Sequence, residues 1–161
     1  MTTYPSFVVT GSATPQPPPA QRLILTVGLP RSGKSTWAAR MRVERGWVVV
    51  ETDAIRLSLL GQRFFGPAEP MIWAITQTMV RALFRAGHDT IILDATSTFR
   101  DRRSFWRSPE WKLCFKIFDT SREICLERAR GSPNADLHAV IEKMASSFEP
   151  VQPDEGDILP D

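Results

Sequence analysis

The chain is poor in cysteine, with only Cys114 and Cys125 among its 161 residues. Two cysteines do not make a disulfide framework, and neither has the C-x-x-C or Cys/His spacing of a metal site. No apolar run approaches the roughly 18 residues of a membrane span, and the first residues lack the pattern of a secretory signal. The composition therefore predicts a cytoplasmic protein without a membrane segment, in which both cysteines are small buried side chains.

An excess of one charge is also missing. The 20 basic and 18 acidic residues give a net charge of +2, which argues neither for nor against a nucleic-acid partner. The length suits one domain with a real core. We expect a flexible, proline-rich arm over residues 1–20, a single domain over 21–150, and a weakly ordered acidic tail over 151–161.

The most informative stretch is residues 28–35, GLPRSGKS, which fits the phosphate-binding loop pattern G-x-x-x-x-G-K-[ST]. The apolar run 23–27 before it has strand length, and residues 36–45 after it have a helical pattern, as this motif requires. Lys34 can reach the β- and γ-phosphates of a nucleotide, and the Ser35 hydroxyl can bind Mg²⁺. The residues predicted to contact the nucleotide are Gly28, Pro30, Arg31, Ser32, Gly33, Lys34, Ser35, Thr36 and Arg128.

Further strands and helices alternate along the chain. Apolar runs predict strands at 47–51, 90–94 and 112–118, and helical patterns lie between and after them. The predicted helices span 54–60, 70–86, 120–129 and 137–148. This order predicts an α/β fold of the P-loop NTPase type, a three-layer sandwich with a four- to five-stranded, mainly parallel sheet and a helical lid.

Two aspartates follow predicted strands, where ligands bind in such a sheet. Asp53 could accept the proton of an attacking hydroxyl, and Arg56, three residues on, could hold a phosphate of the acceptor. Asp94 closes the third strand, where it could orient Mg²⁺ directly or through water and contact the substrate. Helix capping by Asp53 and turn formation by Asp94 are the alternative interpretations.

Two groups of arginines could meet phosphates. Arg128 and Arg130 flank the break at Gly131, and a mobile segment there would work as a lid whose arginine offsets charge on the transferred phosphoryl group. We assign the catalytic role to Arg130, although the sequence leaves open which of the two is the lid arginine. The basic run 100–107 could contact a nucleic-acid backbone or form an amphipathic surface helix.

These residues together resemble the kinase domain of 5′-polynucleotide kinases of the phage and bacterial end-healing type. The matching pieces are GLPRSGKSTW at 28–37, TDAIR at 52–56, IILDAT at 91–96, the arginine pair at 102–103 and RARG at 128–131. The resemblance implies that Lys34 and Ser35 bind ATP and Mg²⁺. It further implies that Asp53 is the general base, that Arg56 holds the acceptor's phosphate and that Arg130 is the lid arginine.

We therefore expect an ATP-dependent kinase that transfers the γ-phosphoryl group to a hydroxyl of a nucleic acid or nucleotide. The acceptor would be a 5′-hydroxyl end or a hydroxyl on a modified base. A kinase for a sugar, nucleoside or antibiotic is the first alternative, and an ATP-binding switch without an acceptor is the second. The sequence leaves open the acceptor and whether the chain forms a homo-oligomer.

Overall fold

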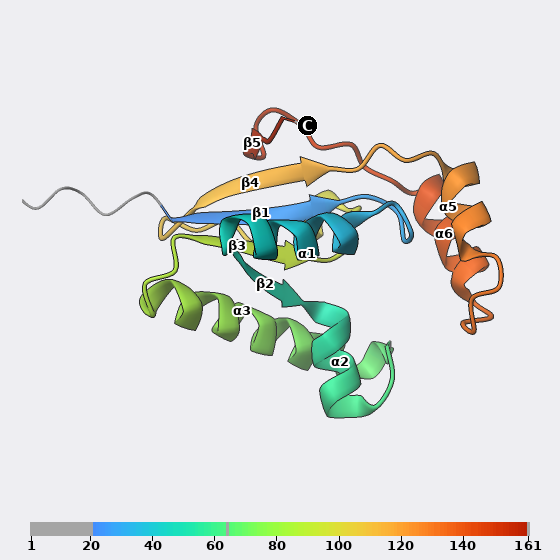
Figure 1. Ribbon diagram of the computed structural model, residues 1–161, viewed down its shortest axis with the longest axis horizontal. Coiled ribbons are helices and arrows are strands. Elements are labelled where there is room, and N and C mark those ends of the chain that lie inside the picture. Colours follow the sequence, from blue (N-terminus) through green and yellow to red (C-terminus); the bar gives the residue numbers. More distant parts are fainter. Residues whose placement is uncertain (1–20, 64, 161) are drawn as a thin grey trace, which may run out of the picture.

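A five-stranded parallel sheet forms the centre of the computed structural model, which describes residues 21–63 and 65–160 (Figure 1). The strand order is β2-β3-β1-β4-β5, so the predicted parallel α/β fold is confirmed. The predicted arm 1–20 lies outside the described residues. The strands are β1 Arg22–Val27, β2 Val48–Glu51, β3 Thr90–Asp94, β4 Lys112–Ile117 and β5 Asp157–Ile158.

Helices cover both faces and one end of this sheet (Figure 1). The helix α1 follows β1, α2 and α3 connect β2 to β3, and α5 and α6 lie together beyond the carboxyl ends of the strands. None of the helices in the described ranges has the length and apolar composition that a membrane crossing requires. The helices are α1 Lys34–Arg45, α2 Thr52–Leu60, the 3₁₀ turn η1 Gly66–Ala68, α3 Glu69–Arg85, α4 Arg100–Ser104, α5 Arg122–Ala129 and α6 Leu137–Ser146.

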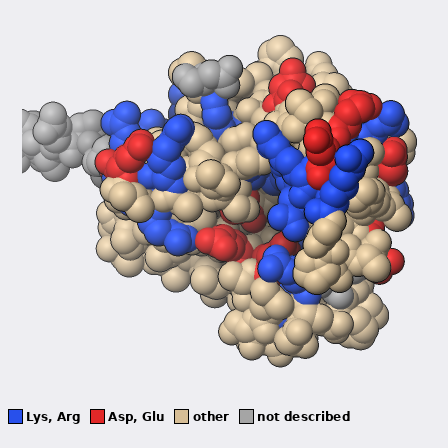
Figure 2. Space-filling view, turned by 45° about the vertical axis from the view of Figure 1, so that its right-hand side comes forward, with Lys and Arg blue, Asp and Glu red and all other residues tan. Residues whose placement is uncertain are grey.

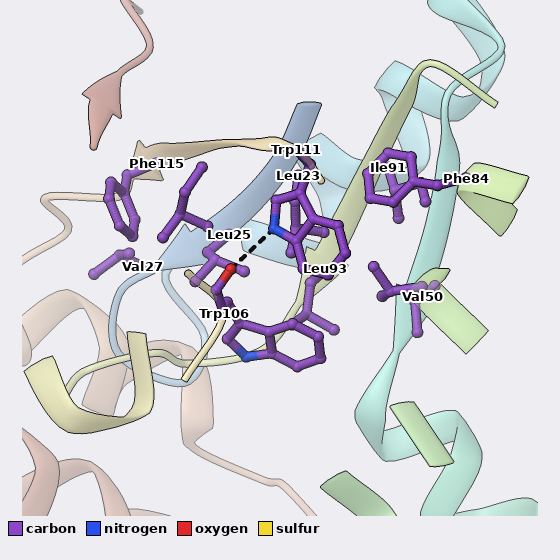
Figure 3. Close-up of a cluster of buried hydrophobic side chains, with 12 residues drawn as sticks. Leu23, Leu25, Val27, Val50, Phe84, Ile91, Leu93, Trp106, Trp111 and Phe115 are labelled. Carbon is purple, nitrogen blue, oxygen red and sulfur yellow. Dashed lines mark hydrogen bonds between the residues drawn. The ribbon is translucent and has the colours of Figure 1, made fainter. Parts of the chain in front are cut away.

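The alternation of β1 side chains between the two faces separates two cores. Leu23 and Leu25 point toward α3 and α4, where Trp106 and Trp111 fill the space; Figure 3 shows this cluster. Ile24 points the other way and packs with residues of α1. A third cluster around Ile141 joins α5 and α6 to the phosphate loop. Cys114 and Cys125 are both buried, as predicted.

The expectation that the C-terminal segment is weakly ordered is wrong for residues 151–160. Glu155 is buried and forms an ion pair with the fully buried Arg103 of α4, with 2.7 Å between Oε2 and Nε. Two residues later the chain adds β5 to the sheet, where Gly156 lies so close to β4 that a Cβ atom would stand 2.6 Å from the Leu113 carbonyl oxygen. The acidic residues thus anchor this segment to the domain.

Candidate functional site

The phosphate loop connects the end of β1 to the start of α1. Arg31 and Gly33 both have left-handed backbones, with φ of 66° and 103°, which turn the loop back on itself. Gly28 is required by a close approach, because a Cβ atom there would stand 2.9 Å from the Phe118 carbonyl oxygen. The first amide groups of α1 have no partner within the helix, so they and the positive end of its dipole are available to an anion.

Lys34 is a buried cation inside this loop. Its Nζ donates hydrogen bonds to the Leu29 carbonyl oxygen at 2.6 Å and to Ser32 Oγ at 3.3 Å. Burial lowers the pKa of Lys34 to about 8, although the negative charges of Asp94 and Asp53 act in the opposite direction. A charged amine held away from water in a loop of open amides is suited to bind phosphate.

The carboxylate of Asp94 stands beside the loop, on the neighbouring strand β3. Burial raises its pKa, while the Ser35 hydroxyl, Lys34 and the Thr26 hydroxyl lower it, and Glu51 raises it further. Thr26 Oγ1 donates to Asp94 Oδ1 at 3.3 Å. A hydroxyl and a partly buried carboxylate, with a second carboxylate near, are the oxygen donors that Mg²⁺ prefers, so these residues fit the ion.

Asp53 lies in the first turn of α2 at the same edge of the sheet. Its side chain is 59% exposed and meets two guanidinium groups, Arg56 at 3.0 Å and Arg63 at 3.7 Å. Acidic side chains lie in a hollow on this face, with basic side chains around it (Figure 2). The structure thus brings the loop, Asp94 and Asp53 together, as the strand order requires.

Arg56 is more constrained than the sequence suggests. It is buried, and Glu69 at the start of α3 accepts two hydrogen bonds of 2.7 Å from its Nε and Nη2. The Arg56 pair lowers the pKa of the Glu69 carboxyl. Sequence reasoning missed Glu69, because no local pattern links it to a residue thirteen positions earlier. The ion pair between Arg56 and Glu69 thus holds in place the guanidinium group that also contacts Asp53.

The segment after α5 lies against the phosphate loop. Arg128 Nη1 donates to the Arg31 carbonyl oxygen at 3.2 Å, and Arg31 Nη2 donates to Ser132 Oγ at 3.3 Å. Arg130 directly follows α5 and is exposed, and within the described part of the chain its guanidinium has no hydrogen-bond or ion-pair partner. Of the two candidate lid arginines, Arg128 is thus engaged by the loop backbone and Arg130 is available.

The basic run 100–107 divides into one buried arginine and three exposed ones. Arg103 is buried against Glu155, and Arg100 and Arg107 both bond Asp154. Arg103 is therefore unavailable to a contact surface, whereas Arg100 and Arg107 stay exposed, and all three have partners about 50 residues later in the chain. One buried and several exposed arginines agree with the alternative interpretation, an amphipathic surface helix. Arg102 differs, because it points toward α3.

These features define a P-loop nucleotide-binding protein with a kinase-like fold. The chain belongs to the AAA domain family, which matches residues 23–151. No curated protein matches the chain in sequence.

Solved structures with the same fold include two complexes that contain Pnkp1. A chain of the Pnkp1/Rnl/Hen1 complex is 30% identical over 70% of this chain, with a TM-score of 0.62. In the Pnkp1/Rnl/Hen1 RNA repair complex the identity is 25% over 86% of this chain, with the same TM-score. The matches cover 40% and 49% of those chains, so this chain spans less than half of their length.

A sugar kinase from Janibacter sp. HTCC2649 also shares the fold. It is 22% identical, with a TM-score of 0.65, and the match covers 88% of this chain and 85% of that one. The fold is therefore shared by a sugar kinase and by a chain of an RNA repair complex.

Proposed function

We propose that this protein is an ATP-dependent kinase that transfers the γ-phosphoryl group to a hydroxyl of a nucleic acid or nucleotide. The observation that carries the proposal is the exposed carboxylate of Asp53, which arginines hold at the edge of the sheet where the phosphate loop opens. An acceptor kinase needs such a carboxylate, whereas a nucleotide-binding switch does not. The likeness to the Pnkp1-containing complexes supports a nucleic-acid or nucleotide acceptor.

Each residue of the site has a part in this reaction. The loop amides and Lys34 hold the β- and γ-phosphates, while Asp53 accepts the proton of the acceptor hydroxyl. Arg56 orients Asp53, and the two N–H groups that Asp53 and Glu69 leave unused would hold the acceptor's phosphate. Arg130 offsets the charge on the transferred group. Ser35 and Asp94 would hold Mg²⁺, which would supply positive charge to offset that of the phosphates.

One observation favours a second candidate, a kinase for a small acceptor. Arg100 and Arg103 form ion pairs and Arg107 donates to the Asp154 carbonyl oxygen, and these contacts disfavour a continuous basic channel along α4 for a long strand. A single nucleotide or another small alcohol needs no such channel.

The test is a panel of acceptors offered with γ-labelled ATP: 5′-hydroxyl DNA, 5′-hydroxyl RNA, nucleotides, nucleosides and sugars. We expect label on a nucleic acid or nucleotide with the wild-type protein and a large loss of label with Asp53→Asn. Label on sugars alone would establish the second candidate, and hydrolysis of ATP without label on any acceptor would refute the kinase assignment.

A further inference from the structure

We propose that a cavity between α3 and α4 is the subsite for the nucleobase next to the reacting hydroxyl. This inference rests on the proposed function and specifies its acceptor as a nucleotide. The cavity has a volume of about 280 Å³ and is lined by Trp73, Asp101, Arg102 and Phe105. This volume lies near the lower end of the range for ligand pockets, roughly 300 Å³, so it suits a single flat ring such as a base rather than a larger ligand.

The side chain of Arg56 connects the cavity to the candidate general base Asp53, because it contacts both Asp53 and Trp73, which lines the cavity. The Arg56 guanidinium carbon stands 5.9 Å from the centre of the Trp73 ring, and Arg56 Nη1 is 3.0 Å from Asp53 Oδ1. Trp73 thus contacts both the cavity and the arginine that holds Asp53, and in the proposed binding mode a ring rests against Trp73 with its attached sugar directed toward Arg56 and Asp53. That arrangement presents a hydroxyl of the sugar to the carboxylate.

Two aromatic rings give this cavity walls that suit a flat ligand. The Phe105 side chain is 47% exposed, and it packs edge-on against the buried Trp106 with ring centres 5.4 Å apart. Trp73 packs on Trp106 as well, at 6.3 Å. Trp106 thus holds both rings in place, and stacking on such pre-placed rings accepts any base because every base has a π-face.

The two charged residues supply polar recognition at the rim of the cavity. The Arg102 guanidinium carbon lies 5.6 Å from the Trp73 ring centre. Within the described part of the chain, neither Arg102 nor Asp101 has an ion-pair partner, unlike their neighbours Arg100 and Arg103. A carboxylate accepts hydrogen bonds from the amino groups of a base, and a guanidinium without a partner binds a phosphate oxygen.

The first test distinguishes the contribution of the acceptor's base to binding from that of its sugar. Two acceptors with a free 5′-hydroxyl, adenosine 3′-phosphate and its abasic analogue, are compared in steady-state kinetics on wild type, Phe105→Ala and Phe99→Ala. Phe99 is a matched control, since it is an exposed phenylalanine just before α4 that does not line the cavity. We expect Phe105→Ala to raise KM for adenosine 3′-phosphate about five-fold or more. The KM for the abasic analogue and for ATP should not change, and Phe105→Tyr should restore the wild-type value.

Two outcomes would overturn the subsite. An equal effect of Phe105→Ala on both acceptors would indicate a sugar or a structural role, and an equal effect of Phe99→Ala would indicate a general disturbance of α4.

A binding measurement tests the subsite independently of the proposed reaction. Titration calorimetry with adenosine 3′-phosphate requires no turnover, so it tests the cavity even if no acceptor is phosphorylated. We expect binding to wild type that weakens in Phe105→Ala. In Arg102→Ala binding should weaken more for adenosine 3′-phosphate than for adenosine, whereas Arg85→Ala, at the far end of α3, should have no effect. Absence of binding to the wild-type protein would refute the inference.

Discussion

Replacement of Lys34 by methionine should stabilise the unliganded protein while it abolishes phosphoryl transfer. The lysine is buried in the phosphate loop, which lowers its pKa from 10.5 to about 8, so its charge disfavours the folded state. A shift of this size corresponds to about 3 kcal/mol at pH 7. The hydrogen bonds to Leu29 and Ser32 offset roughly 1 kcal/mol each, so the expected net gain for Lys34→Met is about 1–2 kcal/mol.

The stability difference between Lys34→Met and the wild type should change with pH in a direction that the lowered pKa determines. The folded pKa lies below the unfolded one, so the unfolded state binds more protons between pH 8 and 10.5. The penalty on the wild type is therefore complete below pH 8 and disappears as the pH rises toward 10.5. The advantage of Lys34→Met should accordingly shrink by about 3 kcal/mol over this window and change sign.

Denaturant unfolding at pH 7 and at pH 10.5 measures both the stability gained by Lys34→Met and its change with pH. Lys143→Met on the exposed face of α6 is the control, and it should show no such pH dependence relative to wild type. Transfer of phosphate by Lys34→Met should fall by on the order of 10²-fold or more, since the triphosphate loses its buried cation. A mutant that is less stable than wild type at pH 7, or a difference that does not change with pH, would refute the reasoning.

Three further predictions concern other parts of the site and its support. Glu155→Ala should lower the free energy of unfolding by about 3 kcal/mol or more, because it leaves Arg103 charged and unpaired in the core, and the added change Arg103→Met should recover much of the loss in the same denaturation assay. Arg130→Ala should reduce kcat more than ATP affinity in steady-state kinetics. If Arg130→Ala keeps the wild-type kcat while Arg128→Ala loses it, Arg128 is the lid arginine instead. Asp53→Asn should bind ATP like wild type in calorimetry and lose roughly 10²-fold in transfer; loss of ATP binding as well would show that Asp53 serves the metal or the fold.

Local patterns were sufficient to predict the part of the molecule that binds phosphate. The glycines and lysine of residues 28–35 have fixed spacing, and the strands β1 and β3 are apolar runs that end at the site. The placement of Asp94 and Asp53 near Lys34 followed from parallel strands whose carboxyl ends share an edge.

Interactions between distant segments could not be predicted in this way. The partner of Arg103 is 52 positions away and the partner of Arg56 is 13 positions away, and neither distance has a periodic signature. The pattern of the run 100–107 therefore could not distinguish a basic contact surface from an amphipathic surface helix with a buried arginine. The strand β5 was missed because it has only two residues, Asp157 and Ile158, too few for any alternation to be recognised.

The buried pair between Arg103 and Glu155 also sets an order of events during synthesis of the protein. A ribosome adds roughly 5–20 residues per second, so Arg103 leaves the peptidyl-transferase centre about 3 to 10 seconds before its carboxylate partner. Until then, a guanidinium destined for the core has only water as its partner, and α4 has no reason to close over the sheet. The wall of the proposed nucleobase cavity that α4 forms can thus be completed only after residue 155 has been synthesised.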